Sequence, residues 1–427
     1  MIVNRAERIR AAITVPPDKS ISHRAFIFNA ISSGTATIDR ALDSADVRST
    51  VACLRALGVE IDWPERAERA TVRGNGLHGL FEADDVLDCG NSGTTMRLMS
   101  GLLAAQPLLS ILTGDESLRR RPMARIIAPL RRMGAAIQGR RGDTLAPIVI
   151  RGGNLRAMDF ASPVASAQVK SALLLAGLYA EGGTTVREPA ASRDHTERML
   201  AAMGAHVGCE GTTVSVSPVP ELRPLSLRVP GDISSAAPWL VLAACHPDAE
   251  VHLQGVNTNP SRTGILDILT AMGADVEVSE ERTTAGEPAA DLIVRSSRLR
   301  GTTVSGELVP RAIDELPLVG LLACFAEGET LVKDAAELRA KESDRVEALV
   351  TVLQRMGARV TPRDDGFLVS GPQALHGARV DAGGDHRIGM LAGIAGLLAE
   401  GETHIANDAV EVSYPTFWDD LRAAAAQ

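Results

Sequence analysis

Features that define several protein classes are scarce or missing in this sequence of 427 residues. Aromatic residues make up 3%, and no apolar run approaches the ~20 residues that span a bilayer. The first ten residues, MIVNRAERIR, lack the apolar core of a signal peptide. The five cysteines (53, 89, 209, 245 and 324) are scattered and form no CxxC pair. This spacing favours reduced thiols over a disulfide framework or a zinc site, so we expect a cytoplasmic protein without membrane contact.

A basic excess is also missing. Acidic residues outnumber basic ones by 53 to 44, and the net charge is −9. A nucleic-acid-binding protein usually carries the opposite balance, so that class is disfavoured. Lysine is rare among the basic residues, because only positions 19, 170, 333 and 341 carry it and the other 40 of the 44 are arginine. Each lysine in such a chain is either a functional residue or a chance occurrence. The functional alternative stands because lysine and arginine side chains bind ligands differently.

The sequence contains an internal repeat. Five amphipathic stretches end in a glycine that is followed by a strand-like run, at Gly58, Gly134, Gly204, Gly273 and Gly357. The spacings of 76, 70, 69 and 84 residues are too long for a solenoid. Glycine at this point suits a left-handed residue that ends a helix, so the pattern predicts helix–strand transitions.

A second kind of helix alternates with the first and is apolar nearly all round, as in LAGIAGLLA (391–399). Such helices belong inside a domain. Six strand–helix–strand–helix units, the last one shortened, predict an α/β fold of two three-unit domains. The proline-rich segment 216–232 and the prolines at 16–17 are candidate connections between these domains.

The first half carries several motifs at predicted helix starts. In PPDKSISHR (16–24), Lys19, Ser20 and Arg24 lie where free N–H groups bind anions, although a plain capped helix is the alternative. DCGNSGTTMR (88–97) is glycine-rich and suits either an anion-binding loop or an ordinary capped turn. No Walker motif occurs in the chain.

Three further motifs of the first half offer polar groups. DESLRRRPM (115–123) supplies arginines that either grip carboxylates and phosphates or lie in a solvated loop. SPVASAQVKS (162–171) places Ser166 and Gln168 at a helix start, which suits sugar-like hydroxyls or phosphate. SRDHTERML (192–200) repeats the pattern with Ser192 and Arg193.

The second half adds acidic candidates. Asp314 and Glu315 precede an apolar helix, where an acid serves as a general base or only as a cap. AKESDRVEAL (340–349) combines Lys341, Glu342 and Arg345, which an ordinary surface ion-pair helix would also explain. GGDHRIGM (383–390) puts His386 and Arg387 at the head of another apolar helix.

Nearly every cationic motif therefore stands at the start of a repeat helix. If each half gathers these starts on one face, helix dipoles and side chains together make that face positive. The sequence thus predicts a basic cleft between two domains that binds a small polyanion.

Nine strings in order along the chain resemble the EPSP synthase (3-phosphoshikimate 1-carboxyvinyltransferase) family of enolpyruvyl transferases. They are PPDKSISHR, GNSGTTMR, RRRPM, SPVASAQVKSALLLAG, SRDHTERM, GDISSAAPWL, IDELP, KESDR and DHRIGM. The resemblance implies two inside-out α/β domains (α+β in another classification), each of three βαβαββ repeats, with the active site in the interdomain cleft. Its implied boundaries are 17–228 for one domain and 1–16 plus 229–427 for the other.

The implied reaction transfers the enolpyruvyl group of phosphoenolpyruvate to the 5-hydroxyl of shikimate 3-phosphate and releases phosphate, without metal or other cofactor. This reaction belongs to the shikimate pathway of aromatic amino acid biosynthesis, and the resemblance implies that the enzyme is a target of glyphosate. The resemblance also implies a monomer.

The same resemblance implies roles for individual residues. Asp314, Glu342 and Lys19 would be catalytic. Shikimate 3-phosphate would be held by Lys19, Ser20, Arg24, Ser166, Ala167, Gln168, Ser192, Arg193, Asp314 and Lys341. Phosphoenolpyruvate would be held by Lys19, Gly93, Arg121, Gln168, Arg345 and Arg387.

The chain departs from many members of the family at a few positions. Ala167 replaces a serine, Leu98 replaces a proline, and 410–418 lacks a lysine that binds phosphoenolpyruvate elsewhere. Gly93 is retained where alanine would narrow the phosphoenolpyruvate pocket.

Two alternatives remain. The sister enzyme that uses UDP-N-acetylglucosamine usually carries a reactive cysteine in the loop at 115–123, where this chain has none. A non-catalytic anion-binding scaffold would have lost Asp314, Glu342 or Lys19, and all three are present.

Overall fold

The structure is a computed structural model that describes residues 1–426, and the chain divides by its internal contacts into two compact units. The first unit comprises 17–229 together with 283–287. The second unit comprises 1–16, 230–282 and the chain from 288 onward. The chain thus passes from one unit to the other at the Pro16–Pro17 pair and at the end of the proline-rich segment, where Val229 meets Pro230.

The first unit contains three sheets with one shared topology. In each, a parallel pair of strands is extended by two antiparallel strands, in the orders β14-β3-β5-β4, β6-β7-β9-β8 and β10-β11-β13-β12. The strands are β3 Ser33–Asp39, β4 Glu60–Asp62, β5 Arg69–Asn75, β6 Leu87–Asp88, β7 Leu109–Thr113, β8 Ala136–Gly139, β9 Leu145–Arg151, β10 Asp159–Ala161, β11 Thr184–Arg187, β12 Val207–Glu210, β13 Thr213–Val216 and β14 Leu227–Arg228. Because β14 pairs with β3, the last strand of this part closes its first sheet.

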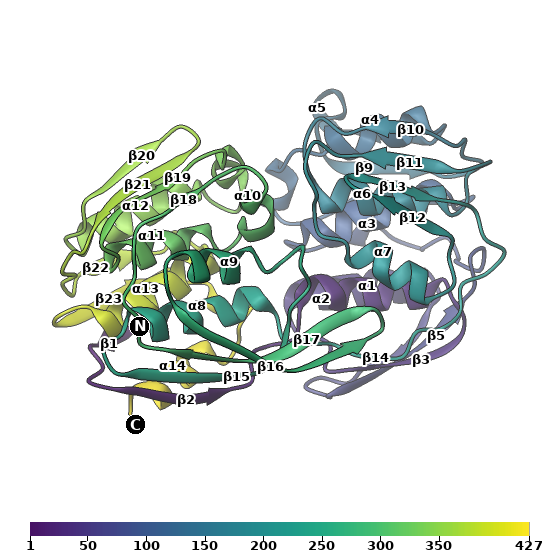
Figure 1. Cartoon of the computed structure of the whole chain (residues 1–427). Coiled ribbons are helices and arrows are strands. Elements are labelled where there is room, and N and C mark those ends of the chain that lie inside the picture. The colour runs from purple at the N-terminus through teal and green to yellow at the C-terminus, as the bar shows by residue number, and fades with distance from the viewer. Residues whose placement is uncertain (427) are drawn as a thin grey trace. The chain divides into compact units, whose positions relative to one another are not determined.

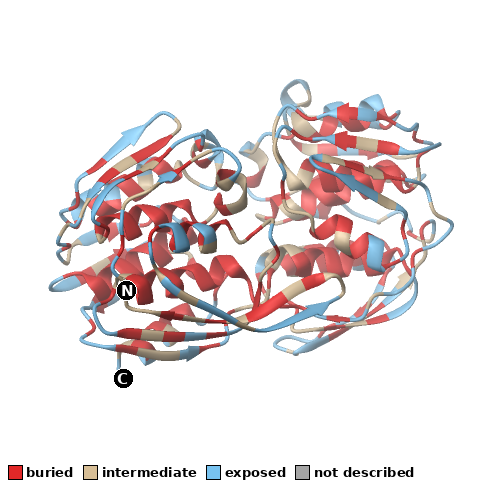
Figure 2. Cartoon of the chain, viewed as in Figure 1, coloured by how far each residue is buried: buried red, intermediate tan, exposed pale blue. Residues whose placement is uncertain are grey.

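Two kinds of helix alternate in the first unit, as the repeat predicts. The interior helices are α1 Lys19–Ala30, α3 Gly93–Ala104 and α6 Ala167–Gly177. The amphipathic helices are α2 Ala45–Ala56, α4 Ala124–Arg132 and α7 His195–Ala202, with the short α5 Arg140–Asp143 and η1 Leu118–Arg120 beside them. The interior helices are buried on nearly all sides (Figures 1 and 2).

The second unit repeats this plan and uses both ends of the chain. Its sheets have the orders β16-β17-β15-β2, β18-β19-β21-β20 and β1-β23-β22. Their strands are β1 Ile2–Asn4, β2 Ile9–Ile13, β15 Ala249–Asn257, β16 Asp275–Thr284, β17 Glu287–Arg295, β18 Thr303–Val304, β19 Gly328–Val332, β20 Val360–Arg363, β21 Gly366–Gly371, β22 Arg379–Asp381 and β23 Glu402–Ala406. The N-terminal β1 lies antiparallel to β23, and β2 lies parallel to β15. The shortened last repeat therefore receives its antiparallel strand from the start of the chain.

The helices of the second unit follow the same alternation. Interior helices are α8 Ile233–Cys245, α11 Leu316–Cys324 and α13 His386–Leu398. The others are α9 Gly264–Ala271, α10 Leu308–Ala312, α12 Arg345–Arg355 and α14 Phe417–Ala425, with the 3₁₀ turns η2 Ala336–Ala340 and η3 Val410–Val412. Every residue of α11 and α13 is buried, so the two units are inside-out α/β units with helices in the core (Figure 2).

The five repeat glycines adopt the predicted conformation. Their φ angles are 86° at Gly58, 107° at Gly134, 93° at Gly204, 86° at Gly273 and 93° at Gly357. Each therefore ends its helix in a backbone region that other residues avoid, which confirms the prediction made from the repeat.

The interior helices α3 and α6 approach each other closely at one glycine. A Cβ atom on Gly101 would lie 2.2 Å from the carbonyl oxygen of Ala172 and 2.6 Å from its Cα. Both are backbone atoms, which cannot turn aside as a flexible side chain can. The absence of a side chain at Gly101 thus sets the distance between two helices that both carry candidate site residues.

We predict that Gly101→Ala lowers the free energy of unfolding by about 1–3 kcal/mol, because overpacking forces the two helices apart. Gly153→Ala is the matched control, since no atom lies within 4 Å of a Cβ at that position and its φ is not left-handed. Urea unfolding of the two variants measures the difference. Equal stabilities would contradict the close helix contact.

Candidate active site

The start of α1 holds the first candidate cation. Asp18 caps the helix by accepting a hydrogen bond from the Ile21 N–H at 2.9 Å, and Lys19 follows directly. The Lys19 Nζ lies 3.2 Å from Oδ2 of Asp46. Burial alone would raise the pKa of Asp46, but the nearby Lys19 and the other positive groups outweigh burial and lower it. Lys19 thus has a carboxylate partner and remains about one fifth exposed.

Arg24 joins three helices of the first unit. Its Nε donates to the Thr196 hydroxyl at 2.8 Å, and one Nη donates to the Ser171 hydroxyl at 2.7 Å. The other Nη donates to the Ser20 carbonyl at 3.0 Å. Burial lowers the pKa of Arg24 to about 10, so its guanidinium remains charged at neutral pH. Arg24 therefore holds the starts of α1, α6 and α7 in one cluster.

A second cluster surrounds the start of α3. Gln168 Nε2 donates to the Thr94 hydroxyl at 2.9 Å, and Arg97 Nη1 donates to Gln168 Oε1 at 2.6 Å. A Cβ on Gly93 would lie 2.7 Å from Arg97 Nη1 and 3.5 Å from Arg121 Nη1. The structure thus brings together Gly93, Arg121 and Gln168, which stand far apart in the sequence.

Ser166 and Ser192 share one carboxylate. Glu188 accepts a hydrogen bond from the Ser166 backbone N–H at 2.7 Å with one oxygen. Its other oxygen accepts from the Ser192 hydroxyl, also at 2.7 Å. Ser166 is the N-cap residue of α6 and Ala167 its first residue, and the Ser166 side chain makes no capping bond. Arg193 follows Ser192 and lowers the pKa of Arg24 slightly through charge repulsion, so these residues lie near the Arg24 cluster.

In the second unit the candidate residues converge on Arg345. Its side chain is 2% exposed and lies at the start of α12. It donates to Asp314 at 3.0 Å, to Glu342 at 2.7 Å and to Asp385 at 2.9 Å. Burial alone would lower the pKa of Arg345, but the carboxylates, Glu342 first, outweigh burial and raise it. Lys341 Nζ lies 3.6 Å from the same Asp314 oxygen, so two cations and three carboxylates form one group.

Arg387 stands beside this group at the start of α13. Asp385 caps that helix by accepting from the Arg387 backbone N–H at 2.9 Å. The Arg387 side chain is buried, and among the described residues its Nε has no hydrogen-bond partner. A buried guanidinium nitrogen without an acceptor is costly, so this position favours an anionic ligand.

Glu315, the other acidic candidate of this segment, points elsewhere. It is 1% exposed and accepts a hydrogen bond from the Ser234 hydroxyl. It does not cap α11 with its side chain. Of the two acids ahead of this helix, only Asp314 therefore joins the Arg345 group.

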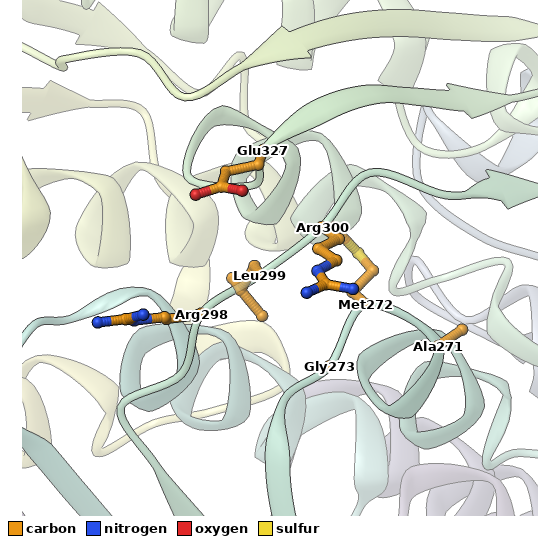
Figure 3. Close-up of a pocket in the computed structure, with 7 residues that line it drawn as sticks. All are labelled: Ala271, Met272, Gly273, Arg298, Leu299, Arg300 and Glu327. Atoms are coloured by element: carbon orange, nitrogen blue, oxygen red, sulfur yellow. The ribbon is translucent and has the colours of Figure 1, made fainter.

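A hollow of about 410 Å³ lies elsewhere in the second unit, at the end of α9. Its lining residues are Ala271, Met272, Gly273, Arg298, Leu299, Arg300 and Glu327, and none is a candidate site residue. Figure 3 shows the two guanidinium groups pointing in different directions, so they do not converge on one anion. We place the chemistry at the helix starts and not in this hollow.

Residues 1–426 contain no group of three or more His, Cys, Asp or Glu side chains arranged to hold a metal ion. None of the helices in this range has the length and apolar character of a membrane span.

The comparisons with known proteins identify the family. The family model described as EPSP synthase (3-phosphoshikimate 1-carboxyvinyltransferase) matches residues 3–421. The chain belongs to the EPSP synthase family. A protein of that name from Herpetosiphon aurantiacus is 53% identical over 420 residues, which cover 97% of each chain.

Solved structures extend the likeness to the fold. EPSP synthase from Acinetobacter baumannii superposes with a TM-score of 0.90 at 43% identity, covering 99% of this chain and 97% of that one. The enolpyruvyl transferase NikO from Streptomyces tendae superposes with a TM-score of 0.79 at 18% identity, covering 99% and 96%. At that identity the second likeness concerns the fold alone. The two-domain inside-out α/β fold of EPSP synthases is thus the fold of this chain.

Sequence reasoning missed several residues that organise these EPSP synthase motifs. Arg97 ends the string GNSGTTMR and Asp385 begins DHRIGM, so both stood inside recognised motifs. The feature that could have identified Arg97 and Asp385 is a charged side chain near a predicted helix start. Glu188 and Asp46 lie outside the nine strings, and no local pattern marks them.

His23 offers a test of the α1 environment. It is fully buried, and Nδ1 lies 2.7 Å from the Thr50 hydroxyl. Burial lowers the pKa of His23 to about 3, against 6.5 for an ordinary histidine. Because the unfolded chain takes up this proton first, its contribution to stability is complete above pH 6.5 and is lost as the pH falls toward 3.

We predict that His23→Asn, which keeps an atom near the Thr50 contact, flattens the pH dependence of stability between pH 6 and 4. The difference from wild type should be about 1.4 kcal/mol per pH unit, corresponding to one proton. Denaturant unfolding of both proteins at several pH values measures it. Parallel curves would show that His23 titrates normally.

Proposed function

We propose that the protein transfers the carboxyvinyl group of phosphoenolpyruvate to the 5-hydroxyl of shikimate 3-phosphate and releases phosphate. The observation that carries this proposal is the full-length family match, combined with the gathering of the matched motif residues at helix starts in each unit. Both substrates are polyanions, which suits buried cations at positive helix ends.

The first unit would supply most of the ligands for shikimate 3-phosphate. We assign this role to Lys19, Ser20, Arg24, Ser166, Ala167, Gln168, Ser192 and Arg193, together with Asp314 and Lys341 from the second unit. Support comes from the hydrogen bonds that connect Arg24 with α6 and α7, the helices at whose starts the two serines lie. Ala167 offers only its backbone, because it lacks a hydroxyl.

Phosphoenolpyruvate would be held by Lys19, Gly93, Arg121, Gln168, Arg345 and Arg387. Gly93 lets the guanidinium groups of Arg97 and Arg121 approach the helix start, since a Cβ there would lie 2.7 Å and 3.5 Å from their Nη1 atoms. Arg387 adds a buried nitrogen that lacks an acceptor among residues 1–426. These groups neutralise the phosphate and carboxylate and stabilise the charge that develops during addition.

The chemistry is an addition followed by an elimination. A proton goes to the methylene carbon of phosphoenolpyruvate, and the 5-hydroxyl oxygen bonds to the neighbouring carbon while losing its own proton. The resulting tetrahedral adduct loses a proton from the methyl group, the carbon–oxygen bond to phosphate breaks, and phosphate leaves. We assign the hydroxyl proton to Asp314 and the methylene proton to Glu342, with Lys19 compensating charge.

The surroundings of the two acids support different roles. Asp314 has an 85% buried side chain held between Arg345 and Lys341, so its carboxylate is fixed as a base requires. Glu342 accepts a hydrogen bond from Arg345, but its side chain is 32% exposed. Because it is less enclosed than Asp314, it is freer to move a proton to and from the substrate. The two carboxylates thus both bind Arg345, but the Asp314 side chain is more buried than the Glu342 side chain.

We further propose that 17–228 and 1–16 plus 229–427 are the two domains of a cytoplasmic monomer that binds neither nucleic acid nor membrane and needs no cofactor. The five cysteines are free thiols, as expected in a reducing compartment. The excess of acidic residues supports small-molecule substrates over nucleic acid.

Phosphate release with different acceptors tests the proposal. We expect release from phosphoenolpyruvate with shikimate 3-phosphate, and the same assay with and without glyphosate measures the response to that inhibitor. Release with UDP-N-acetylglucosamine instead would favour the sister enzyme. Anion binding without phosphate release would favour the non-catalytic scaffold.

We predict that Asp314→Asn and Glu342→Gln each lower turnover by about 10²–10⁴-fold, because each removes a general acid–base group. Phosphate release measures turnover, and circular dichroism checks the fold. Asp344→Asn is the matched control, since Asp344 belongs to the same segment but only caps α12 and pairs with Arg339. Near-normal turnover in either test variant would reject the role of that residue.

We also predict that Gly93→Ala raises the KM for phosphoenolpyruvate but weakens glyphosate inhibition more. The added Cβ would crowd Arg97 Nη1 at 2.7 Å and point toward Arg121 Nη1 at 3.5 Å. Inhibition assays at several phosphoenolpyruvate concentrations separate the two effects. Equal losses, or the same change in Gly153→Ala, would refute a local effect at the site.

A further inference from the structure

Lys170 is one of the four lysines and stands inside a recognised motif, yet the family resemblance gives it no role. Its side chain is 3% exposed. The ammonium nitrogen lies 3.0 Å from Glu188 and 2.7 Å from Glu197, and both carboxylates are equally buried. It also donates to the Ser192 carbonyl at 3.3 Å. Through Glu188, this buried ion group is hydrogen-bonded to two candidate ligands of shikimate 3-phosphate, Ser166 and Ser192.

The charges of the group compensate each other. Burial alone would lower the pKa of Lys170, but the attraction of Glu197 and Glu188 outweighs burial and raises it, so the lysine is charged. Burial raises the pKa of Glu197, and Lys170 opposes this shift. An isolated buried carboxylate would be costly, so Lys170 makes the buried position of Glu188 possible.

Glu188 is the member of the group that reaches the site. It follows β11, and its two oxygens bind different elements, the Ser166 backbone at the start of α6 and the Ser192 hydroxyl ahead of α7. A serine hydroxyl has one hydrogen, so donation to Glu188 fixes its direction. Glu197 has no such bond to either serine within the described residues, although it contacts the same lysine.

We propose that Glu188 is a positioning residue for shikimate 3-phosphate, which holds Ser166 and Ser192 in the arrangement that binds this substrate. The inference rests on the proposed function and deepens it. Preorganised groups bind more tightly because the ligand need not order them. Loss of Glu188 should therefore weaken shikimate 3-phosphate binding and leave the phosphoenolpyruvate ligands unchanged.

The test variant is Glu188→Asp, which keeps a negative charge for Lys170 but is too short to reach both serines. We expect the KM for shikimate 3-phosphate to rise about tenfold, the effect of one lost hydrogen bond, with the KM for phosphoenolpyruvate changed less than about twofold. Glu188→Gln should act in the same direction. A general loss of stability would not produce this split between the two substrates.

The matched control is Glu197→Gln, which removes a buried carboxylate from the same lysine without touching either serine. It should leave the ratio of the two KM values unchanged. If it raises the KM for shikimate 3-phosphate as much as Glu188→Asp does, the role is electrostatic or structural and the proposal fails.

A double-mutant cycle with Ser192→Ala tests the connection itself. If Glu188 acts partly through the Ser192 hydroxyl, Glu188→Asp should have a smaller effect on the KM in the Ser192→Ala background. Equal effects in both backgrounds, or equal changes in both KM values, would overturn the proposal. Wild-type protein that releases no phosphate from this substrate pair would reject the proposed function instead.

Discussion

A buried cation must have fixed hydrogen-bond acceptors around it, and this constraint governs both units. In the interior helices α6 and α13, polar and charged side chains lie only among the first five residues. Arg24 lies in the second turn of the interior helix α1 and Arg345 at the start of α12, and both are almost fully buried. Because removing a charge from water is expensive, each needs fixed acceptors around it. The protein supplies them from neighbouring helices, and this requirement draws several helix starts together.

The compensation differs between the two units, and so does the chemistry that each can support. The hydrogen bonds of Arg24 go to two hydroxyls and a backbone carbonyl, and the carboxylates of Glu197 and Asp18 act on its charge without a hydrogen bond to it. Three carboxylates surround Arg345 and more than cancel its charge. The first arrangement favours holding an anion, whereas the second keeps acids in place for proton transfer. A reaction that binds polyanions and moves protons needs both.

Much of this organisation could be predicted from the sequence. The repeat glycines and the all-apolar helices are local patterns, so they indicated the number of units and the interior helices correctly. The motifs at helix starts also named most of the residues that the structure groups, such as Arg24, Gly93 and Arg345. Their partners were harder to predict, because Asp46 and Glu188 are single acids whose importance arises only from tertiary contacts. The pairing of β1 with β23 is likewise a contact between chain ends that no local pattern encodes.

The charged groups are paired within the protein at the start of α8. Its N-cap Asp232 accepts from Arg262 at 3.1 Å, and Ser234 bonds both Arg262 and Glu315. All four side chains are at least 92% buried. Here the carboxylates of Asp232 and Glu315 lie 3.1 and 3.9 Å from the Arg262 guanidinium, so its charge is already balanced within the protein. At α13 the Asp385 cap binds only the backbone of Arg387, and among the described residues no carboxylate forms an ion pair with its buried side chain. Equivalent helix starts therefore differ in whether their cation is already neutralised, and that difference decides which of them can bind substrate.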